Sequence, residues 1–134
     1  MEKRFELNAS SEVLSPFRKE LRQILSHAGW EKKTAEEILL SIDEALTNII
    51  RHAYQGGTGK MTVSVALTDD RVEFVLEDQG KKFDPTQLPP PELPRLKPGG
   101  LGVHFIKTIM DQMIYENQVS GGNRLRLIKY KTKI

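Results

Sequence analysis

Two polar side chains in the segment SIDEALTNIIRHAY are of types that can do chemistry together. Glu44 and Asn48 are four residues apart and Arg51 follows three later, so all three share one face if the segment is helical. A carboxylate can accept a proton, and an amide oxygen can bind a hard cation such as Mg²⁺. An ordinary solvent-exposed helix face has the same appearance, so this segment alone leaves both interpretations open.

Two further patterns could bind a ligand. In EDQGKKFDP, the Asp78 carboxylate could accept a hydrogen bond from a ligand amino group, and Gly80 would allow close backbone approach, although Asp-x-Gly is also a common turn. In PGGLGVHFIKTIMD, Gly99, Gly100 and Gly102 precede a helical pattern, whose free N–H groups suit a phosphate chain. These glycines could instead relieve a crowded turn.

The elements that must position these residues follow from hydrophobic periodicity. Alternation predicts strands over residues 4–7, 60–68, 71–78, 112–120 and 124–133. Helical spacing predicts a first helix that is capped by Ser10 or Ser11 and ends near Gly29. A second helix is expected from Thr34, with Glu37 completing a capping box, and a third over residues 101–111.

This order of elements predicts a fold class. Strands that come in adjacent pairs favour a mixed, mostly antiparallel sheet, and the helices would cover one of its faces. We therefore expect an α+β fold, a two-layer α/β sandwich, with residues 1–134 forming a single domain. Residues 79–100 hold six of the seven prolines and are expected to form a loop that is functional or disordered.

Composition excludes several classes of protein. With 38% hydrophobic and 28% charged residues, the chain is expected to be globular rather than disordered. It lacks the roughly 20-residue apolar run of a membrane span, the apolar stretch of a secretion signal at its start, and any cysteine, which together agree with a cytoplasmic location. The basic residues near the end alternate with apolar ones without interleaved stacking aromatics, so we expect neither nucleic acid nor a membrane as partner.

The three motifs in this order carry a resemblance. EALTNIIRHAY, then DQGKKFDP, then GGLGVHFIKTIMD resemble the Bergerat or GHKL nucleotide-binding fold of DNA gyrase, histidine kinases, a heat-shock chaperone family and mismatch-repair ATPases. With the short chain length, they are most similar to the anti-sigma-factor serine/threonine kinases of bacterial partner-switching systems. The resemblance extends from the first strand to GGNRLRLIKY.

The resemblance implies roles for individual residues. Asn48 would ligate Mg²⁺, Glu44 would be the general base toward the acceptor hydroxyl, and Asp78 would accept a hydrogen bond from the adenine amino group. Gly80 would seat the base, Gly100 and Gly102 would hold phosphates, and residues 81–100 would form a lid. Further nucleotide contacts would be Arg51, His52, Phe83, Gly99, Leu101, Val103 and Asn123, the last standing where this fold often has a hydroxyl residue.

The resemblance also implies a function and partners. The chain would be an ATP-dependent protein serine/threonine kinase that sequesters a sigma factor and phosphorylates an anti-anti-sigma protein of the STAS type. ATP or ADP with Mg²⁺ would be its cofactors, and homodimerisation is compatible with the family. The alternative is a non-catalytic ATP/ADP-binding switch that acts by partner binding, since a carboxylate at Glu44 does not prove turnover.

Overall fold

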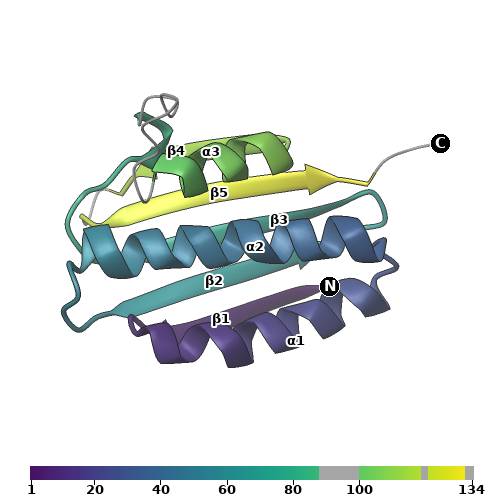
Figure 1. Cartoon of the computed structure of the whole chain (residues 1–134), viewed down its shortest axis with the longest axis horizontal. Helices are drawn as coiled ribbons and strands as arrows, with labels where there is room; N and C mark the ends of the chain where they lie inside the picture. Colours follow the sequence, from purple (N-terminus) through teal and green to yellow (C-terminus); the bar gives the residue numbers. More distant parts are fainter. Residues whose placement is uncertain (88–99, 119–120, 132–134) are drawn as a thin grey trace.

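The computed structural model describes residues 1–87, 100–118 and 121–131 as one sheet and one layer of helices (Figure 1). The strands are β1 (Glu2–Asn8), β2 (Lys60–Leu67), β3 (Arg71–Asp78), β4 (Gln112–Asn117) and β5 (Asn123–Tyr130). The helices are α1 (Leu14–His27), α2 (Lys32–Asn48) and α3 (Gly100–Ile109), with short helical turns η1 (Ser11–Val13), η2 (Ile49–Ala53) and η3 (Pro85–Gln87). The predicted α+β two-layer sandwich is confirmed.

The sheet has the strand order β1-β2-β3-β5-β4, and each of its four neighbouring pairs is antiparallel. The sequence led us to expect a mixed sheet with mostly antiparallel pairs. The pair β1–β2 becomes antiparallel because α1 and α2 form a hairpin between them, so the chain reverses three times before it re-enters the sheet (Figure 1). The register places Asp78 at the end of β3 directly opposite Asn123 at the start of β5.

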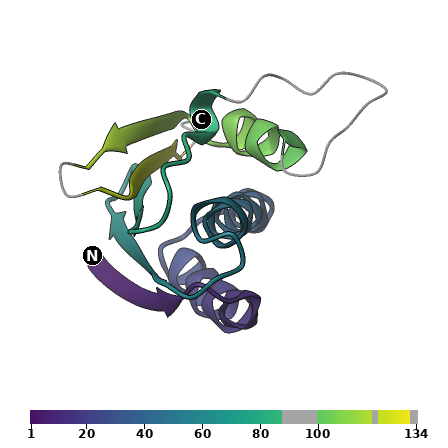
Figure 2. The same cartoon turned by 90° about the vertical axis from the view of Figure 1, so that its left-hand side faces the viewer.

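All three helices lie on the same face of the sheet, and the core lies between the two layers (Figure 2). Helix α1 buries Phe17, Leu21 and Leu25, which share one stripe, and strands β2 and β3 bury alternate residues. The Phe17 ring meets Phe5 of β1 edge-on at 5.0 Å between centroids. Trp30, which lies between α1 and α2, is 7% exposed and belongs to this core.

The helix ends agree only in part with the sequence signals. Ser10 accepts a hydrogen bond from the Glu12 N–H at 3.4 Å, so it caps the turn that leads into α1. The capping box predicted at Thr34 and Glu37 is wrong, because α2 begins at Lys32. The chain already turns at Glu31, whose carbonyl accepts the Ala35 N–H at 2.8 Å, directly after the buried Trp30. Thr34 consequently lies inside the first turn.

The last turn of the second helix is wider than an α-helix. Residues Ile49–Ala53 form a π-helical turn, and the Tyr54 N–H continues it by donating to the Ile49 carbonyl five residues back at 3.0 Å. Such turns occur frequently at functional sites because they re-aim the side chains that follow. Here the wide turn comes directly after Asn48. The Asn48 side chain therefore points in a different direction from those of Arg51 and His52.

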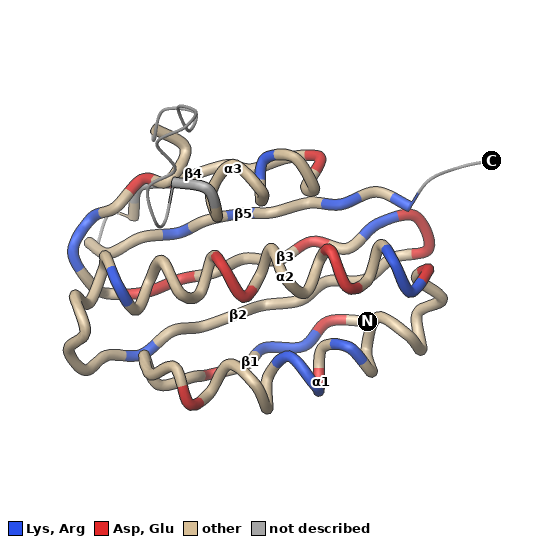
Figure 3. The backbone as a smooth tube through the Cα atoms, viewed as in Figure 1, with Lys and Arg blue, Asp and Glu red and all other residues tan. Residues whose placement is uncertain are grey.

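Acidic and basic residues are interspersed over the helices and the sheet (Figure 3). On the sheet face without helices, Arg126 of β5 pairs with Glu73 of β3 and with Glu116 of β4. These pairs are partly exposed, so each contributes at most about 1 kcal/mol of stability. Within residues 1–87, 100–118 and 121–131, none of the helices has the length and hydropathy that a bilayer crossing requires.

Candidate functional site

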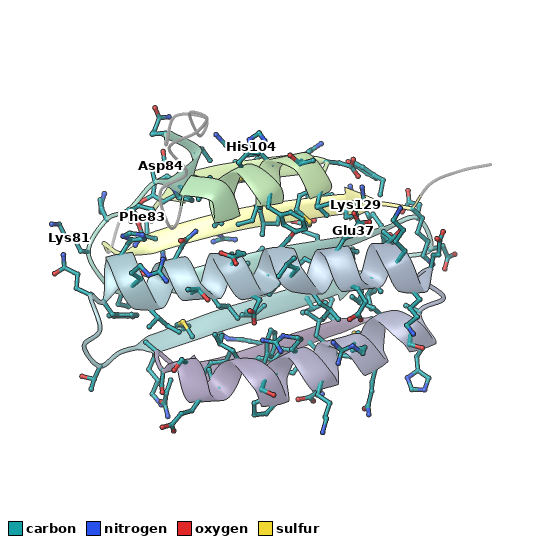
Figure 4. All side chains as sticks on the ribbon, viewed as in Figure 1. Glu37, Lys81, Phe83, Asp84, His104 and Lys129 are labelled. Atoms are coloured by element: carbon teal, nitrogen blue, oxygen red, sulfur yellow. The ribbon has the colours of Figure 1, made fainter. Side chains whose placement is uncertain are left out.

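A pocket opens between the helical layer and the sheet, where α2 and β3 end and β5 begins. It is lined by Ala45, Asn48, Ile49, Ala53, Leu76, Asp78, Phe83, Pro85, Tyr115, Asn123 and Leu125. Lys81, Phe83 and Asp84 follow β3 at this end of the molecule, beside the last turn of α2 (Figure 4). The walls are thus mostly apolar, with a few polar groups, which is the usual composition of a small-molecule site.

Buried polar side chains gather at this pocket. Among the described residues four polar side chains are buried: Ser41, Asn48, Asp78 and Asn123. Ser41 is satisfied inside its own helix, since its hydroxyl donates to the Glu37 carbonyl at 3.0 Å. The other three line the pocket. Burial of a polar side chain costs free energy through lost hydration, so the convergence of three such side chains at one pocket indicates a binding site.

Asn48 lies inward, not on a solvated face. It is 4% exposed, and its Nδ2 atom is enclosed without a hydrogen-bond partner in the described part of the chain. An amide can turn about its last bond, so the same side chain can present Oδ1 to a ligand. An amide oxygen in a pocket mouth fits one position in the coordination sphere of Mg²⁺, which otherwise prefers water and phosphate oxygens.

Glu44 lies one turn earlier on α2, against the first turn of α3. A Cβ atom added at Gly102 would overlap Glu44 Oε2 and would lie 3.0 Å from Glu44 Cδ. The absence of a side chain at Gly102 therefore makes the room in which the carboxylate lies. The sequence placed both residues in the site, and the structure brings them into contact.

Asp78, the last residue of β3, lines the pocket, and Gly80 follows it two residues later. Asp78 is 2% exposed, and its Oδ1 accepts the Gly80 N–H at 2.9 Å. A Cβ atom at Gly80 would lie 2.5 Å from the Ala53 carbonyl oxygen, so only glycine lets this segment approach the end of the helix. The Lys81 N–H then donates to the same carbonyl at 2.7 Å. The Asp-x-Gly turn is thereby tied to the π-helical turn.

The environment of Asp78 disfavours its charge. Burial raises the pKa of Asp78, while hydrogen bonds from the Asn123 amide and the Gly80 N–H lower it in part. A carboxylate that is held in an apolar pocket at this cost fits a role toward a ligand better than a role in stability.

Phe83 forms one wall of the pocket, and His52 packs against it. Their rings stack with 4.4 Å between centroids and 17° between planes. Burial, and to a lesser extent the nearby charge of Arg51, lower the pKa of His52. His52 is thus neutral at physiological pH, and it supports Phe83, which lines the pocket. Arg51 itself is exposed.

The remaining predicted contacts lie at or beyond the start of α3. Gly100 and Leu101 belong to its first turn. Val103 is 2% exposed, so it packs in the interior. Gly99 and most of the predicted lid, residues 88–99, lie outside the described residues. The part of the lid segment that is described includes the turn Pro85–Gln87, which the Lys107 ammonium joins to α3 by donating to the Thr86 carbonyl at 3.1 Å.

Several site residues carried no signal in the sequence. Tyr115 of β4 lines the pocket and donates a hydrogen bond to Asn123 Oδ1. The Tyr54 hydroxyl accepts the Gln79 N–H at 2.8 Å and fixes the end of β3. Gly122 admits no side chain, because its φ is +79° and a Cβ atom would overlap the Asp78 carbonyl. Only the GG-N turn hinted at Gly122, and nothing local marks the two tyrosines.

The arrangement can bind a flat, partly apolar group that carries an amino group, with charged oxygens near Asn48. Within the described residues no three His, Asp or Glu side chains converge as a metal site. A cation at Asn48 would therefore take most of its ligands from water and from the bound molecule.

Known proteins show the same sequence and fold pattern. Residues 7–129 match the sequence model of the histidine kinase-like ATPase domain. The serine-protein kinase RsbW of Staphylococcus epidermidis is 32% identical over 138 residues, covering 95% of this chain and 85% of that protein. The serine-protein kinase RsbW of Halalkalibacterium halodurans is 34% identical over 131 residues, covering 91% of this chain and 78% of that protein.

Solved structures show the same fold. The crystal structure of the RsbU and RsbW domains of a Mycobacterium tuberculosis protein aligns with a TM-score of 0.70 at 19% identity. That alignment covers 96% of this chain, which spans about a third (32%) of the longer structure. The histidine kinase domain of a blue-light activated kinase from Erythrobacter litoralis aligns with a TM-score of 0.55 at 15% identity, over 89% of this chain and 59% of that one.

Proposed function

Because the chain belongs to the family of the RsbW serine-protein kinases, built on the histidine kinase-like ATPase domain, we propose that it is an ATP-dependent protein serine/threonine kinase. The observation that carries the proposal is the convergence on one pocket of Asn48, Asp78 and Asn123, three of the four polar side chains that are buried in the described part of the chain. Glu44 lies one turn of α2 away, beside the first turn of α3.

Each residue has a part in the proposed reaction. Asp78 accepts a hydrogen bond from the exocyclic amino group of adenine, and the His52–Phe83 pair walls the base. Glu44 accepts the proton of the attacking serine or threonine hydroxyl or orients that hydroxyl. The N–H groups of the first turn of α3 face the phosphate end of the nucleotide.

Asn48 would hold Mg²⁺ through its amide oxygen. Its side chain is buried, and its Nδ2 has no hydrogen-bond partner among the described residues, so no bond of that atom prevents the amide from turning its oxygen toward the ion. When bound, the ion neutralises charge on the phosphates and keeps the leaving group in place.

The partners follow from the family and not from this pocket. We propose that the kinase sequesters a sigma factor and that its protein substrate is a small anti-anti-sigma protein of the STAS type. Phosphorylation of that protein would break their complex, as expected of a partner-switching kinase. The acceptor would be a serine or threonine, as in the serine-protein kinases that the chain resembles.

A thermal unfolding scan tests the nucleotide site. Mg-ADP at about 100 times its Kd is expected to stabilise the protein by about 2.7 kcal/mol, or about 10 °C in Tm. Asn48→Ala is expected to lose the magnesium-dependent part of this shift. Trp30, the single tryptophan and a buried one, reports unfolding by its fluorescence.

Ser41→Ala is the matched control for this scan. It removes another buried polar group from α2, but one that is bonded inside the helix and does not line the pocket. Ser41→Ala should keep the full shift with Mg-ADP. Absence of any shift at millimolar nucleotide, or an equal loss in both variants, would overturn the proposed nucleotide site.

Gly102→Ala tests the contact between Gly102 and Glu44. The added methyl group forces the Glu44 carboxylate to move, so phosphoryl transfer to a STAS-type protein should fall about 10- to 100-fold. Stability should change little, because the displaced atoms are the far end of a flexible side chain. If Gly102 acts through Glu44, the same substitution in a Glu44→Gln background should add no further loss. Equal losses in both backgrounds would assign Gly102 a separate role.

A further inference from the structure

Asn123 uses its whole hydrogen-bonding capacity within the protein. Its Nδ2 donates to Asp78 Oδ1 and to the Lys81 carbonyl, each at 2.9 Å. Its Oδ1 accepts the Phe83 N–H at 2.8 Å and the Tyr115 hydroxyl. A primary amide has two N–H donors and two acceptor positions, so none is left for a nucleotide. The direct nucleotide contact expected for Asn123 from the sequence therefore does not fit its bonding.

The orientation of this amide is determined by its neighbours. The Phe83 N–H can only donate, so the atom that faces it must be the oxygen. Burial raises the pKa of Tyr115, as do the charges of Asp84 and Asp78, so its hydroxyl keeps its proton and donates to the same oxygen. The NH₂ group is consequently turned toward Asp78.

The two carboxylate oxygens of Asp78 therefore differ in their hydrogen bonding. Both of its side-chain hydrogen bonds to described residues, from Asn123 Nδ2 and from the Gly80 N–H, fall on Oδ1. These two bonds leave Oδ2 to accept a hydrogen bond from a ligand in the pocket, which Asp78 lines. An oxygen of an ionised carboxylate accepts hydrogen bonds only, so it fits an amino group and repels a carbonyl oxygen.

We propose that Tyr115 and Asn123 are positioning residues that hold the Asp78 carboxylate with one oxygen facing the base, and so set the preference for adenine over guanine nucleotides. The Tyr115 hydroxyl orients the Asn123 amide, and the amide orients Asp78. In this role neither residue forms a hydrogen bond to the nucleotide itself. The inference rests on the proposed nucleotide site and adds two residues through which its base specificity is set.

The proposal has a consequence for pH. Burial raises the pKa of Asp78, and the Asn123 amide is the larger of the two groups that counteract it. Without that amide, Asp78 binds a proton more readily, and a protonated carboxyl can donate to a carbonyl oxygen. Other titratable groups around this end are Tyr115 of β4, Lys81 and Asp84 after β3, and, from α2 and the turn that follows it, Glu44, Arg51, His52 and Tyr54.

The test compares the affinities for Mg-ADP and Mg-GDP by isothermal titration between pH 6 and pH 8. Wild-type protein should prefer ADP at each pH. Asn123→Ala should bind ADP about 10- to 100-fold more weakly, with GDP affected less, and its ADP affinity should rise with pH as Asp78 ionises. Tyr115→Phe, which keeps the ring and its packing, should lower the ADP-to-GDP preference about fivefold.

Tyr130→Phe is the matched control, since it removes the exposed hydroxyl of Tyr130 at the far end of β5. It should behave as wild type. Equal losses for ADP and GDP without new pH dependence, or an unchanged preference in Tyr115→Phe, would overturn the positioning role while leaving the nucleotide site in place. Wild-type protein that binds neither nucleotide would overturn both proposals.

Discussion

Asp78→Asn is expected to weaken adenine nucleotide binding by about 30- to 1,000-fold, a loss of about 2–4 kcal/mol. The amide can keep its oxygen toward the Gly80 N–H and the Asn123 amide, so its NH₂ group turns to the pocket. There it meets the amino group of adenine donor to donor. Isothermal titration with Mg-ADP measures the loss.

The same substitution should not destabilise the unligated protein. Because the pKa of Asp78 is raised in the fold, the native state binds its proton more readily than the unfolded chain does. Stability therefore falls as the pH rises from the ordinary pKa of an aspartate to the raised pKa, and above it the buried charge costs stability in full. The neutral amide removes this cost, so Asp78→Asn should be at least as stable as wild type at pH 7–8. The difference should shrink toward acid pH.

Asp69→Asn is the control for both measurements. It neutralises an exposed carboxylate in the β2–β3 hairpin, at the opposite end of β3 from the pocket. It should leave nucleotide affinity and the pH dependence of Tm as they are. Undiminished ADP binding by Asp78→Asn would remove Asp78 from the site, and a lower Tm at pH 7–8 would assign it a structural role.

The sequence was most informative where a residue's role depends on its near neighbours. Alternation predicted β2 and β3 almost to the residue, and the 3.6-residue period predicted the buried stripe of α1. The spacing of Glu44 and Asn48 placed both on one flank of α2. It could not show that this flank is covered, because the covering element, α3, is more than fifty residues away along the chain.

The roles that the sequence could not predict depend on sheet register and on backbone detail. Asp78 and Asn123 are 45 residues apart and become neighbours only through the pairing of β3 with β5. Tyr115 reaches Asn123 diagonally, because its direct partner across β4 and β5 is Leu125. The π-helical turn Ile49–Ala53 left no mark on the apolar spacing, because it ends the helix and no further helical turn follows in which a changed period would show.

The buried polar residues that suit this pocket for ligand binding also lower the stability of the unligated fold. Asn48 has a buried amide nitrogen without a partner, and Asp78 has a buried carboxylate whose charge the surroundings disfavour. A nucleotide with its cation would compensate at both residues: the Asn48 amide oxygen would bind the cation, and the Asp78 carboxylate would gain a hydrogen-bond donor. The unligated kinase is thereby expected to be least stable where it binds, which is why nucleotide should raise its Tm strongly.

Glu44→Gln is expected to lower the rate of phosphoryl transfer by about 10²- to 10⁴-fold while Mg-ATP still binds. Glutamine has the same shape, so it keeps its place beside Gly102, but it cannot take a proton from the acceptor hydroxyl. Transfer of labelled phosphate from ATP to a STAS-type protein measures the rate, and the Tm shift with nucleotide measures binding.

Glu37→Gln provides the control on the same helix. Glu37 lies two turns before Glu44 on α2, toward the end of the helix that is remote from the pocket (Figure 4). Its neutralisation should leave transfer unchanged. A Glu44→Gln rate within about threefold of wild type would remove Glu44 as general base, because a base contributes at least about 10²-fold. If instead transfer and nucleotide binding fell together, Glu44 would act on the nucleotide and not on the hydroxyl that attacks it.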